Sequence, residues 1–257
     1  MYIYSNIYLI QYQTMEKKVP PKNLGVNIIS ATYDNNYGEL NYLIADWKKH
    51  DILNYKNKNG ETAIWIACRY GYPDCADILL ENGADPNIQS KFGETSCYIA
   101  AQYGNKKCLT ALISYGADFL RIRDLRGELP IHVACYHNKI ECVKILLTYG
   151  TPVNIQDKDG RTGCYICSYH DHYECLELLI RNGCDVNIER NNGRTPTYVA
   201  SAEGNPICLQ MLIAFGSDVN KPDKLGRTPL LTAATGYEEI KNILRKNGAH
   251  AVANSSL

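Results

Sequence analysis

The sequence lacks an excess of charge of either sign, and it lacks any long uncharged apolar run. Its 257 residues include 27 basic and 27 acidic side chains, and 45% of them are hydrophobic. A nucleic-acid-binding domain is typically strongly basic, so the charge balance argues against a nucleic-acid partner. No stretch approaches the roughly 20 uncharged apolar residues that a membrane-spanning helix needs, so we expect no membrane partner. The apolar content is enough for a sizeable folded body.

The sequence also lacks the features of a secreted protein. Its first residues, MYIYSNIYLIQYQTM, have no basic leader, and Asn6, Gln11 and Gln13 interrupt them, which is unlike a cleaved signal peptide. The eleven cysteines are an odd number without paired spacings, which favours a reducing compartment. We therefore expect a protein of the cytoplasm or the nucleus. Either Met1 or Met15 can be the start of the chain.

A regular period runs through the sequence. Glycines recur 33 or 34 residues apart, at positions 60, 93, 127, 160, 193 and 226. Each opens a similar line: GETAIWIACRYG, GETSCYIAAQYG, GELPIHVACYHN, GRTGCYICSYHD, GRTPTYVASAEG and GRTPLLTAATG. A second series follows, which includes CADILLENGADPN, CLTALISYGADFL and CLELLIRNGCDVN. A period of this length is typical of solenoid proteins, in which each unit stacks on the next.

The repeated lines predict two short helices in each unit. Apolar residues at helical spacing, such as Ile64, Ala67 and Cys68, give the first helix one apolar side. A threonine stands where this helix begins and is expected to cap it, at positions 62, 95, 162, 195 and 228. Residues that tolerate a left-handed backbone separate the two helices, at positions 71, 104, 138, 171 and 204. Neither helix can bury its apolar side alone, so the repeats are expected to stack.

These lines resemble ankyrin repeats, whose pattern runs Gly-x-Thr-Pro-Leu-His-x-Ala, then a helix pair and Gly-Ala-Asp-x-Asn. The resemblance recurs in register over residues 24–250. It implies an all-α fold, an ankyrin-repeat α-solenoid of about seven helix-turn-helix repeats with short hairpin loops. We expect a disordered extension at 1–23 and a degenerate capping repeat at 24–57. Six repeats and a disordered tail follow, at 58–90, 91–123, 124–157, 158–190, 191–223, 224–250 and 251–257.

One stretch, CYICSYHDHYEC at residues 164–175, has thiols and imidazoles at the close spacing of a zinc site. The repeat register gives a plainer explanation. Cys167 occupies a position that is alanine in the other full repeats, and Cys175 matches the cysteine that opens the second helix elsewhere. His170 and His172 flank the turn between the helices. Because a buried free cysteine behaves as a small hydrophobe, we predict no metal site and no cofactor.

A line of tyrosines is the candidate binding surface. The resemblance implies that partners usually contact the concave face of the first helices and the hairpin tips. The two exposed positions before each inter-helix turn hold Arg69–Tyr70, Gln102–Tyr103, Tyr136–His137, Tyr169–His170 and Ala202–Glu203. Aromatic residues are enriched at interface cores, so we interpret this strip as a partner-binding site. The alternative is that the chain, with 20 tyrosines, simply uses this residue often.

A second pattern concerns the charge after each leading glycine. The next residue is acidic in three full repeats and basic in the following three: Glu61, Glu94, Glu128, Arg161, Arg194 and Arg227. Further cations lie in the loops beside the later repeats, at Arg121, Arg123, Arg126, Arg190, Lys221 and Lys224. Such a ridge can orient an acidic partner, mainly through the association rate. The alternative is ordinary solvated charge.

The sequence departs from the family pattern in two places. The histidine that ties the loop by hydrogen bonds appears only as His132, and Trp, Tyr or Leu stands there in the other repeats. The second full repeat ends ADFLRIRDLRG, without the usual asparagine and with one extra residue. We therefore expect altered ties in most repeats. We also expect a distorted loop near residues 119–126, which is either a recognition element or drift.

The function that the resemblance implies is a non-enzymatic scaffold that binds another protein. No nucleophile–base pair or phosphate-binding loop stands outside the repeats, so we expect no catalysis. We expect the protein to be monomeric. The alternative is a substrate adaptor or assembly chaperone for a machine of the ubiquitin–proteasome type. The sequence shows no helical recruitment box after the last repeat, so such an adaptor is expected to recruit through the stack itself.

Overall fold

The computed structural model describes residues 23–46, 50–233 and 236–250. The expected tail (251–257) and all but the last residue of the expected extension (1–23) lie outside these residues. The described chain is all-α, as predicted. Its helices are α2 (Leu24–Tyr33), α3 (Tyr37–Asp46), α4 (His50–Leu53), α5 (Ala63–Tyr70), α6 (Pro73–Glu81), α7 (Ser96–Tyr103), α8 (Lys106–Ser114), α9 (Pro130–Tyr136), α10 (Ile140–Thr148), α11 (Gly163–His170), α12 (Tyr173–Arg181), α13 (Pro196–Glu203), α14 (Pro206–Ala214), α15 (Pro229–Thr232) and α16 (Glu238–Lys246). Among them, no helix is both long and apolar enough to cross a bilayer.

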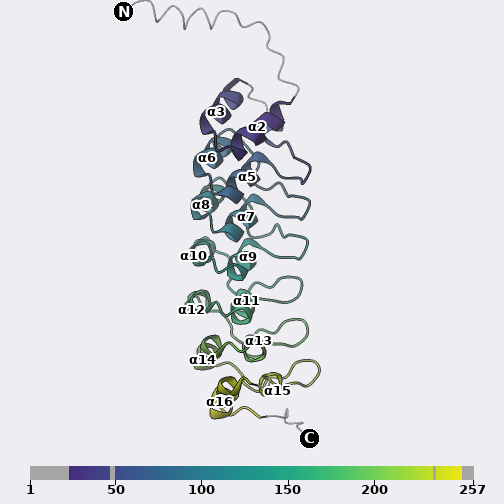
Figure 1. Cartoon of the computed structure of the whole chain (residues 1–257), viewed down its shortest axis with the longest axis vertical. Helices are drawn as coiled ribbons and strands as arrows, with labels where there is room; N and C mark the ends of the chain where they lie inside the picture. The colour runs from purple at the N-terminus through teal and green to yellow at the C-terminus, as the bar shows by residue number, and fades with distance from the viewer. Residues whose placement is uncertain (1–22, 47–49, 234–235, 251–257) are drawn as a thin grey trace, which may run out of the picture.

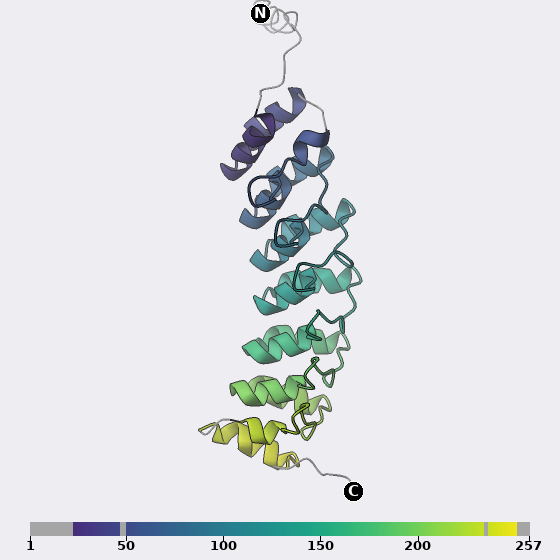
Figure 2. The same ribbon diagram turned by 90° about the vertical axis from the view of Figure 1, so that its right-hand side faces the viewer.

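The helices form two columns in one elongated stack. The first helices of the repeats, α5 to α13 in odd numbers, form a column beside the loops, and the second helices, α6 to α14 in even numbers, form the other column (Figure 1). Turned by 90°, the helix pairs appear as tilted layers along one axis (Figure 2). Each first helix contacts the first helix of the next repeat, and each second helix contacts the next second helix. The predicted α-solenoid is therefore confirmed.

Threonine caps begin most of the first helices. The hydroxyls of Thr62, Thr95, Thr162 and Thr195 each accept a hydrogen bond from the backbone N–H three residues later, at 3.1–3.4 Å. The prediction was wrong for Thr228, whose hydroxyl instead donates to the carbonyl of His250 at 3.1 Å. The helix that Thr228 precedes, α15, has only four residues. A terminal repeat has one neighbour to cover it, and such repeats are commonly atypical.

The turns and the core follow the repeat register. Gly71, Gly104 and Gly204 have φ of 72°, 79° and 80°, and Asn138 and Asp171 take the same left-handed conformation with φ of 53° and 58°. A cysteine and a leucine four residues later face inward in each interior second helix and are at most 1% exposed, at Cys75/Leu79, Cys108/Leu112, Cys142/Leu146, Cys175/Leu179 and Cys208/Leu212. Burying one such leucine stabilises the fold by about 1.5–3 kcal/mol.

The insertion in the second full repeat changes a shorter segment than 119–126. The extra residue is accommodated at 119–121, where the carboxylate of Asp118 accepts hydrogen bonds from the backbone of Leu120 and Arg121 at 3.3 and 3.0 Å. Beyond it, Asp124 N–H donates to the carbonyl of Glu128, and the equivalent bond from Ser90 forms in the preceding loop. The distortion is therefore limited to the turn.

Candidate partner-binding surface

The four strip tyrosines occupy the same place in successive first helices. Tyr70, Tyr103, Tyr136 and Tyr169 lie at or next to the last residue of α5, α7, α9 and α11. Each exposes 43–48% of its surface. The preceding residues of these helices are buried between repeats, as with Ala67 and Cys68 in α5. The helical period therefore directs each tyrosine out of the stack at a constant position.

Arg69 organises the first half of this tyrosine strip. Its guanidinium carbon lies 5.7 Å from the ring centroid of Tyr70 and 5.6 Å from that of Tyr103 in the next repeat. It also lies 5.5 Å from the ring of the buried Trp65, and it pairs with Glu61 at 3.8 Å. A cation over an aromatic face is attracted by the ring quadrupole, so Arg69 joins two neighbouring tyrosines.

His170 plays the equivalent part in the second half of the strip. Its ring centroid lies 4.5 Å from that of Tyr136 and 4.8 Å from that of Tyr169, in edge-on geometry in both cases. His137 packs against Tyr136 at 5.0 Å. Burial lowers the pKa of His170 below its ordinary value, which favours the neutral ring at neutral pH. The tyrosines of this half are thus held by neutral imidazoles.

The remaining strip residues join the halves and mark the end. Gln102 Nε2 lies 3.4 Å from His137 Nε2, which connects α7 to α9. Glu203 is exposed at the end of α13, and the neighbouring position holds Ala202 rather than a tyrosine. The structure thus places Arg69, Gln102, His137, His170 and the four tyrosines in one continuous line. Glu203 lies one repeat beyond them.

The charged ridge is mostly paired, with its acidic residues largely buried and its arginine side chains 23–43% exposed. Glu128 is 3% exposed, and it accepts a hydrogen bond from the hydroxyl of Tyr98 at 2.9 Å. Its two carboxylate oxygens pair with Arg126 at 2.8 Å and with Arg161 of the next repeat at 3.0 Å. Arg161 also pairs with Asp157 at 2.6 Å. These charges neutralise one another inside the loops.

The other ridge residues are partnered in similar ways. Glu61 is 6% exposed and Glu94, half-buried, accepts a hydrogen bond from Ser90 at 3.0 Å. Arg227 and Arg194 pair with the buried Asp223, at 2.6 and 3.7 Å. Burial acts to raise the pKa of Asp223, but hydrogen bonds from Arg227 and from the backbone hold that pKa well below its usual range. Partner steering by this surface stays a prediction, in which the three paired ridge arginines take a reduced part and the exposed Arg121, Lys221 and Lys224 a larger one.

A cavity lies beneath the second half of the strip. It has a volume of about 270 Å³ and is lined by Tyr136, Arg161, Tyr165, Ile166, Tyr169, His170 and Arg190. Tyr165 is 4% exposed and forms its floor with Ile166. Arg190 pairs with Asp159 at 3.2 Å. The cavity therefore combines aromatic walls with guanidinium groups, which suits an aromatic or acidic side chain of a protein partner.

Sequence reasoning missed three apolar residues at the loop tips. Phe92, Leu125 and Leu225 expose 64%, 66% and 75% of their surfaces. Phe92 and Leu125 occupy adjacent loops joined by a backbone hydrogen bond from Leu125 N–H to the Phe92 carbonyl. Lys58, Lys158 and Asn191 stand near the corresponding tips of other loops. The signal in the sequence was an apolar residue at a loop-tip position that is polar in other repeats.

Comparison with known proteins identifies the family. A family model described as ankyrin repeats (3 copies) matches residues 28–122, 97–190 and 164–255. The chain therefore belongs to the ankyrin-repeat family. Proteins of this family are generally protein–protein interaction modules, and their fold is known as a non-enzymatic interaction scaffold.

Individual relatives agree with this assignment. A putative ankyrin repeat protein of Rickettsia felis is 30% identical over 120 residues, which are 46% of this chain and 39% of that protein. The match thus spans about two-fifths of that relative's length. The ankyrin repeat domain of Bcl-3, a unique member of the IkappaB protein family, has a TM-score of 0.76 at 24% identity and covers 85% of this chain and 97% of its own. The human ASB11 ankyrin repeat domain has a TM-score of 0.77 at 24% identity, with 86% and 96% covered. These two likenesses show the fold alone.

Proposed function

We propose that this chain is a non-enzymatic scaffold that binds a protein partner along the strip of Tyr70, Tyr103, Tyr136 and Tyr169. The observation that carries the proposal is that the strip's exposed rings are already held in place. Arg69 lies between two of them and His170 between the other two. Because these contacts already restrict the side chains in the free chain, forming the complex costs less conformational entropy.

The chemistry of the strip indicates what kind of segment it binds. Four tyrosines offer ring faces with hydroxyl tips, and Arg69 adds a cation that is 39% exposed. The cavity below Tyr136 and Tyr169 adds the guanidinium groups of Arg161 and Arg190. We propose that the partner contributes apolar and acidic side chains to this surface, because aromatic and Arg positions dominate the energy of protein interfaces. Phe92 and Leu125 extend the same interface to the loop tips.

Three substitutions test this proposal in the full-length chain. The variant Tyr103→Ala/Tyr136→Ala/Tyr169→Ala removes most of the strip. A matched control, Tyr115→Ala/Tyr149→Ala/Tyr173→Ala, removes three tyrosines that are 43–49% exposed but belong to the second helices or their ends. Each tagged protein is used to purify partners from native extract, with mass spectrometry as the readout and circular dichroism as the check on folding.

The two variants are expected to behave differently. A partner retained by the wild-type chain and by the control, but lost from the strip variant, supports the proposal. A folded strip variant that recovers the same partners in the same amounts overturns it. We further propose that the protein acts as a monomer in the cytoplasm or the nucleus. Strip-dependent recovery of ubiquitin-ligase or proteasome subunits is the outcome that favours the adaptor alternative.

A further inference from the structure

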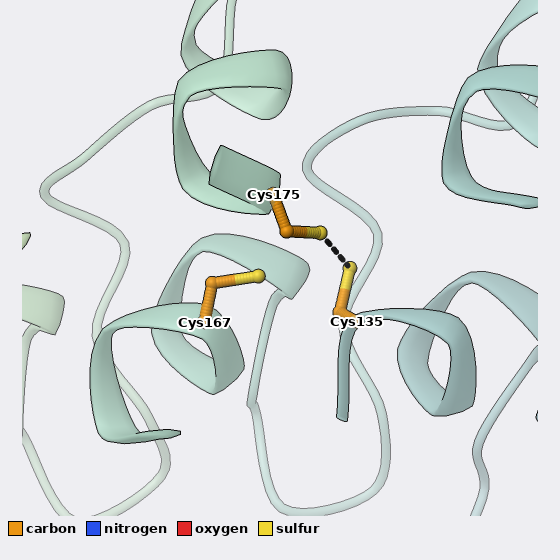
Figure 3. A group of neighbouring side chains, drawn as sticks. All are labelled: Cys135, Cys167 and Cys175. Carbon is orange, nitrogen blue, oxygen red and sulfur yellow. Dashed lines mark hydrogen bonds between the residues drawn. The ribbon is translucent and has the colours of Figure 1, made fainter. Parts of the chain in front are cut away.

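Three thiols meet in the interior of the stack, away from the tyrosine strip. Cys135 lies near the end of α9, Cys167 in α11 and Cys175 in the first turn of α12. Their sulfur atoms all lie within 4.8 Å of one another, and each of the three residues is 0% exposed. Figure 3 shows the three side chains pointing toward one another from three helices of two successive repeats.

The thiol of Cys175 behaves unlike its counterparts in other repeats. In three repeats the equivalent thiol donates to a main-chain carbonyl of the preceding first helix, as in Cys108 to Ala67, Cys142 to Ala100 and Cys208 to Cys167, at 3.9–4.0 Å. Cys175 instead contacts the sulfur of Cys135 at 4.0 Å. Cys75, the fifth cysteine of this series, bonds the side-chain oxygen of Asn35 at 3.5 Å. Cys175 is thus the member of the series whose thiol bonds another sulfur rather than an oxygen.

Cys167 supplies a third sulfur that the comparable pair lacks. Cys68 and Cys108 are also 40 residues apart in sequence and interact through their thiols, so they repeat the Cys135–Cys175 relationship two repeats earlier. The position equivalent to Cys167 is there Ala100. The chain thus contains one two-thiol pair and one three-thiol cluster built on the same backbone positions.

We propose that Cys135, Cys167 and Cys175 form a binding site for a thiophilic d¹⁰ metal ion, Cu(I) or Zn(II). Soft thiolate ligands select these ions. With metal–sulfur bonds of about 2.3 Å, sulfurs around one ion lie roughly 3.8–4.0 Å apart, close to the observed 4.0 Å between Cys135 and Cys175. No further Cys, His, Asp or Glu ligand atom joins the group in the part of the chain that the structure describes. Three thiolates complete a trigonal Cu(I) site, whereas Zn(II) requires a fourth ligand.

Ion binding at this cluster is coupled to proton release from its thiols. The three cysteines are fully enclosed by the packed helices, and they ligate an ion as thiolates. Ion binding then releases protons and is stronger at higher pH. Cys175 stands in the first turn of α12, where the positive end of the helix dipole stabilises a thiolate. The sequence-based prediction of no metal site considered residues 164–175 alone, and Cys135 lies outside them.

Metal titration of the full-length chain tests the site. The reduced protein is titrated anaerobically with Cu(I) against a colorimetric Cu(I) chelator, and separately with Zn(II) against a zinc-sensitive dye, with native mass spectrometry for stoichiometry. The test variant is Cys167→Ala, which folds readily because alanine occupies this position in the other full repeats. The matched control is Cys108→Ala, which removes one thiol of the two-thiol pair. Circular dichroism confirms that both variants are folded.

The proposal predicts one ion per wild-type chain and per Cys108→Ala chain, with at least a tenfold weaker affinity in Cys167→Ala. The arm that shows this difference identifies the ion as Cu(I) or Zn(II). Absence of stoichiometric binding in both arms overturns the proposal. Binding that survives Cys167→Ala, or that Cys108→Ala removes equally, overturns it as well, because the ion then resides elsewhere.

Discussion

The side-chain oxygen of Asn87 accepts a hydrogen bond from the backbone N–H of Asp118 in the next loop, at 2.7 Å. The same bond recurs along the stack, in the pairs Asn54–Asp85, Asn154–Asp185, Asn187–Asp218 and Asn220–His250. The ladder breaks where the second full repeat lacks its asparagine, and there the next loop has Pro152. Proline has no N–H to donate, so the missing acceptor and the missing donor compensate each other.

Removing one rung of this ladder is expected to destabilise the stack. In Asn187→Ala the chain loses the bond to Asp218 N–H at 2.9 Å and the bond to the Gly216 carbonyl at 3.2 Å. At about 0.5–1.5 kcal/mol for each bond, the free energy of unfolding should fall by about 1–3 kcal/mol in urea titration. Asn182→Ala is the control, because its side chain bonds only within its own repeat, to the Leu178 carbonyl. A loss in the control as large as that in Asn187→Ala contradicts the role of the ladder.

The buried ion pairs around Glu128 should matter more than exposed pairs. Arg161→Met leaves the buried carboxylate of Asp157 without its cation, and breaking such a partly buried pair costs about 2–4 kcal/mol. Arg181→Met removes a surface pair with Glu177, in which the side chains are 73% and 49% exposed. That change should alter stability by less than about 1 kcal/mol. If chemical denaturation shows equal losses of stability for the two variants, the pairs around Glu128 contribute no more than a surface pair.

His132 gives the fold a defined pH dependence. Its Nδ1 accepts a hydrogen bond from Leu129 N–H at 3.0 Å, and its Nε2 lies 3.0 Å from the Ile155 carbonyl, so the folded chain holds the neutral ring. Burial lowers its pKa from 6.5 to about 4. Because the unfolded chain binds the extra proton between these values, stability is full above pH 6.5 and falls as the pH drops toward 4, by up to about 3 kcal/mol.

His132→Tyr isolates this contribution, since tyrosine stands at the same position in three other repeats. Denaturation curves at pH 7.5 and pH 5 should differ less for the variant than for the wild-type chain. Histidines elsewhere affect both proteins equally. If the two proteins lose the same stability on acidification, the buried neutral His132 does not cause the pH dependence of stability.

Salt should have little effect on association. The ridge arginines Arg161, Arg194 and Arg227 already pair with carboxylates of the chain, so these three contribute little net charge to steer a partner over a screening length. Between low and physiological ionic strength, the association rate of a captured partner should change by less than about threefold in surface plasmon resonance. A steep decrease with salt supports steering by the ridge instead.

Most of the fold could be predicted from the sequence because the same apolar spacing, caps and turn residues recur in each repeat. The spacing of Ile64, Ala67 and Cys68 fixed which side of a first helix is buried, and threonine caps recurred at the expected places. Thr228 was mispredicted because its pattern matches the others, while its repeat has only one neighbour. Local signals do not report the loss of a neighbour.

The contacts between repeats could not be read from single positions. The cluster of Cys135, Cys167 and Cys175 joins residues up to 40 positions apart, and each cysteine alone fits a small apolar site. Glu128 looks solvent-exposed in the sequence because it follows a turn glycine, yet in the structure it is 3% exposed and pairs with Arg161 of the next loop. The signal in the sequence is that Cys135 and Cys175 are 40 residues apart, the same separation as Cys68 and Cys108.

Hydrogen–deuterium exchange of the full-length chain, with and without its captured partner, tests the strip most directly. The account predicts that protection gained on binding concentrates at the ends of α5, α7, α9 and α11, around Tyr70, Tyr103, Tyr136 and Tyr169, and at the loop tips of Phe92 and Leu125. Peptides from α6, α8, α10 and α12 should change little. Protection confined to these second helices, with the strip exchanging as in the free chain, contradicts it.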